Sequence, residues 1–441
     1  MKFLVAVLVL MASIVGLGSA YAADKPQILE VVSPGGIRAW LRQDASVPLI
    51  AMDFRFAGGA VLVPADKAGA AVLAARMLRE GAGDRDAEAF RLVLADHSIS
   101  LGFDVTREGF SGSVLTLTEN QELAAGLLRD AMLSPQLEAV ALKRVRDSMV
   151  TSARRRSQNP TSLAFKAWRE RAYTGHPYAV GTEGDEETLP GIGTADLEAF
   201  LAQVLNRRTL IIGVAGDIGP EALGPLLDLA FGDLPDREPP APTAPLPPMQ
   251  AGIEVVPHPA NQSVIVFGHK AVSRSDPDWP AALVVAQILG GSSFSSRLGQ
   301  EIREKRGLAY GIGASMRAYK NGGILAGRTA TRNDAAGETL RIIGEEWRRL
   351  AKEGPTAAEV EDAKTYLIGS FPLSLDSTGS VASVLVTMQY YDLGRNYWQE
   401  RSAQFDAVTL ADAKRVAERL LQADALLSVV AGQPEGVTSS F

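Results

Sequence analysis

The chain has 441 residues, of which 46% are hydrophobic and 22% are charged. This composition is that of a globular protein and excludes a disordered or fibrous chain. The formal net charge is −7, with no long runs of one sign, whereas a nucleic-acid-binding protein usually carries a basic surface. We therefore expect no nucleic-acid partner, and the length is sufficient for several domains.

The N-terminus carries the pattern of an exported protein. Lys2 is followed by an apolar stretch at residues 3–17 and by a small-x-small site, Ala-Tyr-Ala, at 20–22. This pattern predicts a signal peptide over residues 1–22 that is cleaved on export. A retained membrane anchor is the alternative, but the apolar stretch is short for a bilayer span. The chain has no cysteine for disulfides or lipid attachment, so we expect a periplasmic protein that is not membrane-bound after cleavage.

Elements of the first half follow from periodicity. Apolar residues alternate with other residues in VPLIAMDFRF, residues 47–56, which predicts a half-buried strand. A helix is predicted over residues 67–79, and later a helix over 194–205 leads into a strand over 208–218. The proline-rich residues 233–250 predict an extended linker, because proline lacks the backbone donor that a helix or strand needs.

The second half repeats this plan. A strand at residues 261–272 precedes a helix at 278–290, and a helix at 409–421 leads into a strand at 425–433. In each half the late helix begins at a threonine cap with a nearby aspartate, and the strand after it contains Ala-Gly. The repeat spans about 215 residues, which is too long for a solenoid unit and indicates duplication of a whole domain. Chance similarity of two helix–strand pairs is the alternative.

The linker then divides the mature chain into an N-terminal half, residues 23–232, and a C-terminal half, residues 251–441. Strands and helices alternate within each half, which predicts an α+β fold with helices packed on one side of each sheet.

Candidate catalytic residues are few. No two of the four histidines stand at metal-ligand spacing on one element, and a catalytic zinc requires three protein ligands. There is no G-x-S-x-G elbow, phosphate loop or dinucleotide fingerprint. A Ser-His-Asp triad stays open, because its members need not be close in sequence. His176 precedes a proline, and we predict that it caps backbone in a turn. The histidines are His97, His176, His258 and His269.

Three stretches together resemble a known family. SSFSSRLGQEIREKRGLAYGIGAS at residues 292–315, the His-Pro-Tyr segment and strand within 175–218, and the opening strand and helix within 47–83 resemble the pitrilysin/insulinase family of zinc metallopeptidases. That family includes the mitochondrial processing peptidase. The resemblance covers nearly the whole mature chain. It implies two homologous α/β sandwich halves that face each other as a clam shell around a chamber.

Active members of this family carry H-x-x-E-H on the first helix. The two histidines bind zinc, and the glutamate activates the zinc-bound water as general base. Aligned through Met77-Leu78, Val72 and Arg76 stand for the histidines and Ala75 stands for the glutamate. Valine and alanine offer no ligand atom, and arginine is always protonated.

The third zinc ligand of the family, a glutamate, falls near residues 151–153. This chain has Thr151, Ser152 and Ala153 there, and none of them is acidic. The resemblance therefore implies that this chain has no zinc and no catalytic residue of its own.

Some members of the family work in pairs, in which one subunit carries the zinc motif and the other helps to bind substrate. The family's C-terminal arginine and tyrosine, which contact substrate near the active site, match Arg303 and Tyr310. The resemblance implies that these two residues bind substrate. On their own, Arg303 would be assigned to a surface salt bridge and Tyr310 to a core or an edge strand.

The resulting expectation is a non-catalytic, substrate-binding subunit of a periplasmic heterodimeric zinc endopeptidase. Its partner would be a homologous zinc-containing peptidase subunit, and its substrate a peptide or unfolded protein. The first alternative is a solitary peptide-binding or scaffold protein of the same fold. The second is an active hydrolase that uses other residues and is inhibited by a serine-directed reagent.

Overall fold

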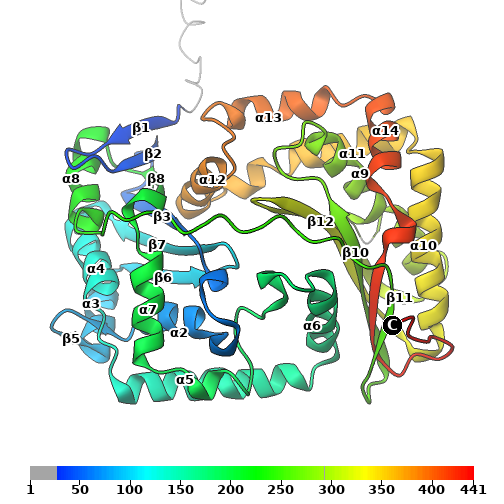
Figure 1. Cartoon of the computed structure of the whole chain (residues 1–441). Coiled ribbons are helices and arrows are strands. Elements are labelled where there is room, and N and C mark those ends of the chain that lie inside the picture. Colours follow the sequence, from blue (N-terminus) through cyan, green and yellow to red (C-terminus); the bar gives the residue numbers. More distant parts are fainter. Residues whose placement is uncertain (1–26, 293) are drawn as a thin grey trace, which may run out of the picture.

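The computed structural model of the chain describes residues 27–292 and 294–441 (Figure 1). The predicted signal peptide, residues 1–22, lies outside the described residues. Within the described part, no helix is both long and apolar enough to cross a membrane.

The N-terminal half contains a mixed sheet in the strand order β1-β2-β8-β3-β7-β6. Strands β2 and β8 are parallel, and the other neighbours are antiparallel. The strands are β1 (Leu29–Val32), β2 (Arg38–Gln43), β3 (Leu49–Ala57), β6 (Ser100–Val105), β7 (Gly109–Leu117) and β8 (Ile211–Gly216), with a separate small hairpin of β4 (Gly81–Ala82) and β5 (Arg85–Asp86). The helices are α2 (Ala70–Met77), α3 (Ala87–Asp96), α4 (Gln121–Leu133), α5 (Ala139–Ser157), α6 (Pro160–Ala172), α7 (Thr194–Val204) and α8 (Pro220–Phe231).

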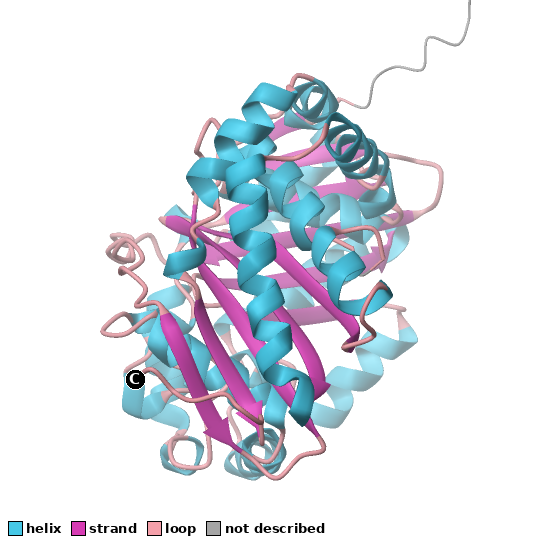
Figure 2. Ribbon diagram, turned by 90° about the vertical axis from the view of Figure 1, so that its right-hand side faces the viewer, coloured by secondary structure: helices cyan, strands magenta, loops and turns pink. Residues whose placement is uncertain are grey.

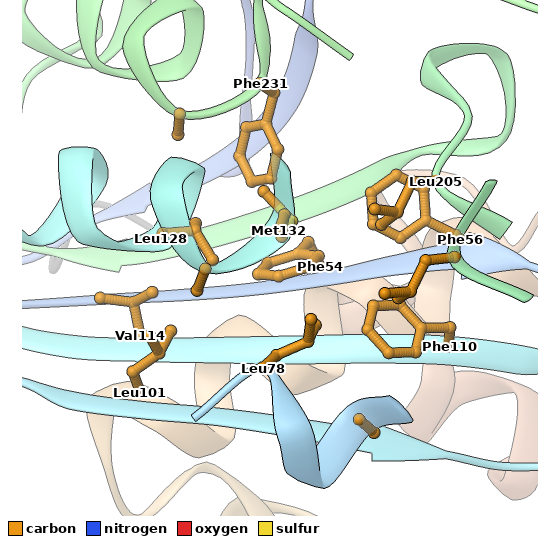
Figure 3. Packing of buried hydrophobic residues seen from close by; sticks show 14 of the residues in the cluster. Phe54, Phe56, Leu78, Leu101, Phe110, Val114, Leu128, Met132, Leu205 and Phe231 are labelled. Atoms are coloured by element: carbon orange, nitrogen blue, oxygen red, sulfur yellow. The ribbon is translucent and has the colours of Figure 1, made fainter. Parts of the chain in front are cut away.

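The core of this half forms on one face of β3. Phe54 and Phe56 are fully buried there, and the Phe231 ring of α8 meets the Phe54 ring edge-on at a centroid distance of 5.2 Å (Figure 3). Burial of each such side chain contributes about 1.5–3 kcal/mol, so this face holds the helices to the sheet.

The C-terminal half contains a second sheet in the order β11-β12-β10-β13-β9. Its strands are β9 (Gly252–Pro257), β10 (Gln262–Ala271), β11 (Ala309–Tyr319), β12 (Gly322–Arg332) and β13 (Leu427–Gly432). Its helices are α9 (Trp279–Gly290), α10 (Ala336–Glu353), α11 (Ala357–Gly369), α12 (Thr378–Tyr390), α13 (Tyr397–Asp406) and α14 (Leu410–Leu420), with a π-helical turn at Gly299–Glu304. Figure 2 shows helices lying across the outer face of this sheet.

The two sheets share one topology. Strands β2, β8, β3, β7 and β6 follow one another across the first sheet as β9, β13, β10, β12 and β11 do across the second. In both series the first two strands, β2 and β8 or β9 and β13, are parallel, and the remaining neighbours are antiparallel. The predicted α+β fold of two homologous sandwich halves is confirmed.

Each half lends a helix to the other half's sheet. Helix α6 packs on β10 and β13 of the second sheet, and the Trp168 indole N–H donates to the Leu427 carbonyl oxygen at 3.1 Å. Helix α12 packs on β3 and β8 of the first sheet (Figure 1). A Cβ at Gly213 of β8 would lie 2.4 Å from the Ala382 carbonyl oxygen, so glycine permits this close approach.

The exchange corrects one prediction. The apolar face of β3 is buried as predicted, but α12 packs on the second face and buries Ala51, while Asp53 and Arg55 there stay partly exposed. Helices therefore cover both faces of each sheet, whereas the sequence predicted one. Periodicity within one segment does not reveal a cover supplied by residues 378–390, more than 300 positions away in the sequence.

Two local differences concern helix starts. The first helix begins at Ala70 and not at residue 67, because Gly69 has a left-handed φ of 101° and residues 65–67 form a separate 3-10 turn. Thr409 caps α14 as predicted, but Thr194 lies inside α7 and makes no side-chain cap bond. There the Asp196 carboxylate accepts from the Gly193 N–H at 2.8 Å. Residues 235–250 form neither helix nor strand.

Candidate functional site

Helix α2 carries the positions that the sequence resemblance aligns with the zinc motif of active relatives. It packs against α5, α7 and β6. Ala75 is only 3% exposed, Val72 is half-buried against the N-terminal core, and Arg76 is exposed. Helix α2 is thus amphipathic, because its apolar side chains face the core and Arg76 faces outward.

The residues of α5 that would supply the third ligand are engaged locally. The Thr151 hydroxyl donates to the Asp147 carbonyl oxygen at 2.9 Å, and the Ser152 hydroxyl accepts from the Arg155 guanidinium at 2.9 Å. Ala153 is buried.

A zinc ion does not fit these residues. Zinc is bound by thiolate, imidazole or carboxylate groups, and α2 presents an isopropyl group, a methyl group and a guanidinium instead. Among the described residues no cluster of three or more His, Cys, Asp or Glu could hold a metal ion. This agrees with a chain that holds no zinc, and no step of metal chemistry is assigned to it.

Arg303 and Tyr310 lie together, as their predicted shared role requires. Arg303 is in the π-helical turn, and Tyr310 is in β11 with 90% of its surface exposed. The Arg303 guanidinium carbon lies 5.0 Å from the centre of the Tyr310 ring and 3.9 Å from the centre of the Phe294 ring. Arginine between two aromatic rings is held by cation–π attraction and apolar contact.

The predicted alternatives for this pair fit less well. Arg303 also approaches the Glu304 carboxylate at 3.4 Å, but the two residues are neighbours in sequence, so this pair joins no separate elements. Tyr310 does lie on an edge strand, yet its exposure excludes a core role. Substrate binding by Arg303 and Tyr310 stays a prediction.

A chamber of about 1260 Å³ extends from Tyr310 along the second sheet. Its wall is formed by β11, β12 and part of β10, by α6 from the N-terminal half and by α9 and α11. Because α6 is the helix exchanged between the halves, the chamber has walls from both. Strand β11, which lines it over most of its length, is an edge strand of its sheet.

Sequence reasoning missed the polar residues of this chamber. Arg317 and Arg328 line it from β11 and β12, and Arg107 and Arg169 line it from the N-terminal half. No local motif marks them, because they are scattered over more than 200 residues and converge only in the tertiary structure. Phe294, which stacks on Arg303, was also missed, because no motif marks a contact between these two residues although they are only nine positions apart.

His176 has the structural role that was predicted. Its Nδ1 accepts from the Tyr178 backbone N–H at 3.2 Å, and its Nε2–H donates to the Ala244 carbonyl oxygen at 3.0 Å. The ring is buried and stacks edge-on with Tyr178. His176 therefore stabilises the turn after α6 and binds the linker to this turn through the Ala244 carbonyl oxygen.

Comparisons with known proteins agree with this geometry. A family model described as peptidase M16 inactive domain matches residues 192–367. The non-peptidase homolog YmxG of Helicobacter pylori is 24% identical over 371 residues, which cover 83% of this chain and 85% of that protein. An uncharacterized zinc protease of Mycobacterium bovis is 25% identical over 308 residues, which cover 68% of this chain and 69% of that protein.

A solved structure matches almost the whole chain. The crystal structure of the peptidase M16 inactive domain from Pseudomonas fluorescens has a TM-score of 0.88 and 26% sequence identity, and the match covers 93% of this chain and 98% of that one.

The duplicated sandwich fold, together with a first helix that has no zinc ligand, defines a non-catalytic homologue of a zinc peptidase. The resemblance to the zinc metallopeptidase family is confirmed, because residues 192–367 match the model described as peptidase M16 inactive domain and the similar proteins carry related descriptions.

Proposed function

We propose that this chain is the substrate-binding, non-catalytic subunit of a heterodimeric zinc endopeptidase of the periplasm. One observation carries the proposal. A chamber has walls from both halves, while Val72, Ala75 and Arg76 stand where the sequence resemblance places the zinc-binding and general-base groups of the first helix. Such a chain would bind a peptide in its chamber and would not cleave the peptide bond.

The chamber suits an extended peptide. Its volume of about 1260 Å³ exceeds the roughly 300–1,000 Å³ of ordinary small-molecule sites. Strand β11 runs along it at the edge of the sheet, and an extended peptide can add to such an edge through backbone hydrogen bonds. A peptide or unfolded protein is therefore the proposed substrate.

Arg303 and Tyr310 are proposed to contact the peptide where it continues into the partner's site. The exposed Tyr310 hydroxyl would donate a hydrogen bond, and Arg303 would form charged hydrogen bonds to a carbonyl or carboxylate. Phe294 and Tyr310 hold the guanidinium between them, so little of its orientation would have to be fixed on binding.

The partner is proposed to be a homologous subunit that carries H-x-x-E-H and its zinc ion. The predicted signal peptide supports a periplasmic location for the pair.

The test measures cleavage of a quenched fluorescent peptide by this chain, by a zinc-bearing homologue and by the mixture. We expect strong cleavage only in the mixture, and loss of that cleavage on adding a chelator. Combining Arg303→Ala with Tyr310→Phe should lower the rate of peptide cleavage by the mixture about tenfold or more. Arg341→Ala, on the outer helix α10, is the control and should leave the rate unchanged. Robust, chelator-sensitive cleavage by this chain alone would overturn the proposal.

A solitary peptide-binding or scaffold protein is the second candidate. It is favoured by one observation, namely that the two halves of this chain already form a chamber with the edge strand β11 along it. Affinity purification from the native periplasm with mass spectrometry separates the two functions. Recovery of the chain without any zinc peptidase, combined with peptide binding by the chain alone, would support this second function.

A further inference from the structure

We propose that the chamber selects peptides whose side chains are acidic. This inference rests on the proposed function, because it names the substrate class of the same chamber. It comes from the charges of the chamber wall, which differ from those of the rest of the molecule.

The wall is basic although the chain is acidic. The whole sequence has 51 Asp and Glu residues against 44 Lys and Arg residues. Among the described residues, those that line the chamber include no Asp or Glu and the following arginines: Arg107, Arg169, Arg317, Arg328 and Arg332. A random sample of this chain's surface residues would contain acidic groups as well. The positive charge of the wall is therefore specific to the chamber.

Arg317 and Arg328 reach the chamber from one face of the sheet. Arg317 is paired with Ile324 across β11 and β12, and Ile324 and Arg328 share a face because they are four residues apart on one strand. Ile324 packs in the same apolar cluster as Trp168 of α6. Both arginines therefore stand on the face that α6 and the chamber share.

These two arginines have no internal counter-charge. Both side chains are exposed, and neither side chain forms an ion pair or hydrogen bond with any other described residue. By contrast, Arg332 approaches the Asp334 carboxylate at 3.0 Å, which balances its charge. Arg317 and Arg328 are thus free to bind carboxylates of a ligand.

The opposite wall adds positive charge. Arg107 contacts the rings of Tyr173 and Tyr178 and forms no ion pair within the described part of the chain. Its neighbour Arg169 approaches the Glu170 carboxylate at 3.8 Å, so only part of the charge of Arg169 is balanced. Burial, and after it the charge of Arg107, lowers the pKa of the Arg169 guanidinium. An arginine nevertheless stays protonated at neutral pH. Two like charges on this wall therefore lie close enough to raise the potential of the chamber.

Such a wall attracts one sign of ligand. Clefts with low-dielectric walls concentrate the field of the charges that line them. Guanidinium groups also match carboxylates geometrically, with two parallel hydrogen bonds. A peptide with Glu or Asp side chains gains both effects, whereas a lysine-rich peptide meets repulsion.

The experiment measures binding by the full mature chain without a partner. Three fluorescein-labelled peptides of equal length differ only in carrying Glu, Gln or Lys at the same positions, and fluorescence anisotropy gives their Kd values. At low salt the Glu peptide should bind about tenfold more tightly than the Gln peptide, and the Lys peptide should bind most weakly. The preference should fall at high salt, because counter-ions screen exposed charges.

Matched variants locate the effect. Arg317→Gln combined with Arg328→Gln should weaken binding of the Glu peptide about fivefold to tenfold and leave the Gln peptide unchanged. The same two positions changed to Lys should keep the preference. Arg341→Gln with Arg348→Gln removes equal charge from α10, on the outer face of the sheet, and should change nothing.

Three results would overturn the inference. They are equal affinity for the Glu and Lys peptides, an unchanged preference in the Arg317→Gln/Arg328→Gln chain, and no binding of any peptide. The subunit function would still stand in each case if the mixture with a zinc-bearing homologue cleaves peptides. Conversely, acid-selective binding without partner-dependent cleavage would refute only the subunit function.

Discussion

At the scale of single residues, Ala75 shows what the first helix has lost. Its methyl group is 3% exposed and packs in the N-terminal core, at the position that the sequence resemblance aligns with the general base of active relatives. The other buried residues of α2 are alanines, Leu73 and Met77, so none of them could bind a cation beside a carboxylate introduced here.

We predict that Ala75→Glu destabilises the chain by about 2 kcal/mol or more, because it buries an unpaired charge in a packed core. The loss should be larger at pH 7 than at pH 4, where the introduced carboxyl is protonated. Urea unfolding followed by circular dichroism measures it.

The control for this change is Arg79→Glu. Arg79 is exposed just after α2, so its replacement should alter the free energy of unfolding by less than about 0.5 kcal/mol. A chain with Ala75→Glu that is as stable as the parent at pH 7 would show that the site tolerates a carboxylate without zinc.

The residue scale also shows where prediction from sequence succeeds. The family resemblance paired Arg303 with Tyr310, and the structure places them together because only residues 305–308 separate the π-helical turn from β11. Phe294 was not predicted as their neighbour. Its ring reaches Arg303 because Phe294 lies against the π-helical turn, where the Gln300 side-chain amide donates to the Phe294 carbonyl oxygen, and no periodicity encodes that contact.

At the scale of elements, the packing of α12 on β3 buries a titratable group, the carboxyl group of Asp53. Asp53 of β3 lies beneath α12, and burial raises its pKa to about 6, while a hydrogen bond with Ser383 opposes the rise. Arg55, two residues on and on the same face, stacks on the Tyr390 ring at 4.1 Å. The side chains of Asp53 and Arg55 therefore both lie against α12, which belongs to the C-terminal half.

The raised pKa predicts a fall in stability with rising pH. Because the folded state binds the Asp53 proton more tightly than the unfolded state does, this contribution is fully present below about pH 4. It is lost as the pH rises to about 6, at a cost on the order of 2 kcal/mol. Asp53→Asn removes it, so the stability of that variant relative to the parent should rise between pH 4 and pH 6.5 in urea unfolding.

Asp362→Asn is the matched control for the pH experiment. Asp362 is exposed on α11, and its replacement should leave the difference from the parent constant across the same pH range. A constant difference for Asp53→Asn as well would show that α12 does not bury the Asp53 carboxyl.

At the scale of the whole molecule, exchanged helices and one carboxylate join the halves. Glu108, in the turn between β6 and β7, accepts from the Tyr178 hydroxyl, from the Tyr390 hydroxyl at 2.9 Å and from the Lys320 backbone N–H at 3.1 Å. Lys320 and Tyr390 belong to the C-terminal half. Together with α6 and α12, this carboxylate makes each half part of the other's structure.

We therefore predict that neither half folds well alone. A fragment of residues 23–232 would expose the face of β3 and β8 that α12 covers, including the buried Ala51. It should aggregate or bind a hydrophobic dye, and co-expression with residues 251–441 should restore a soluble 1:1 complex. Size-exclusion chromatography and circular dichroism measure both outcomes.

The two separate fragments provide the opposing result. Monomeric fragments that each unfold cooperatively, at the midpoint of the whole chain, would show that the exchanged helices contribute little to stability. Trp168→Phe in the whole chain offers a milder check, because it leaves the Leu427 carbonyl oxygen without its donor at a cost of about 1–3 kcal/mol.

The sequence by itself determined the resemblance to the zinc metallopeptidase family, the duplicated α+β plan and the absence of that family's zinc motif. These features lie in local periodicity and in contiguous stretches such as residues 67–83 and 292–315, so no tertiary contact is needed to see them. Only the tertiary structure decided that α6 and α12 cross to the other half and that Arg107, Arg317 and Arg328 line one chamber. The physical reason is that burial and potential depend on which surfaces meet in space, and segments hundreds of residues apart carry no mark of that meeting.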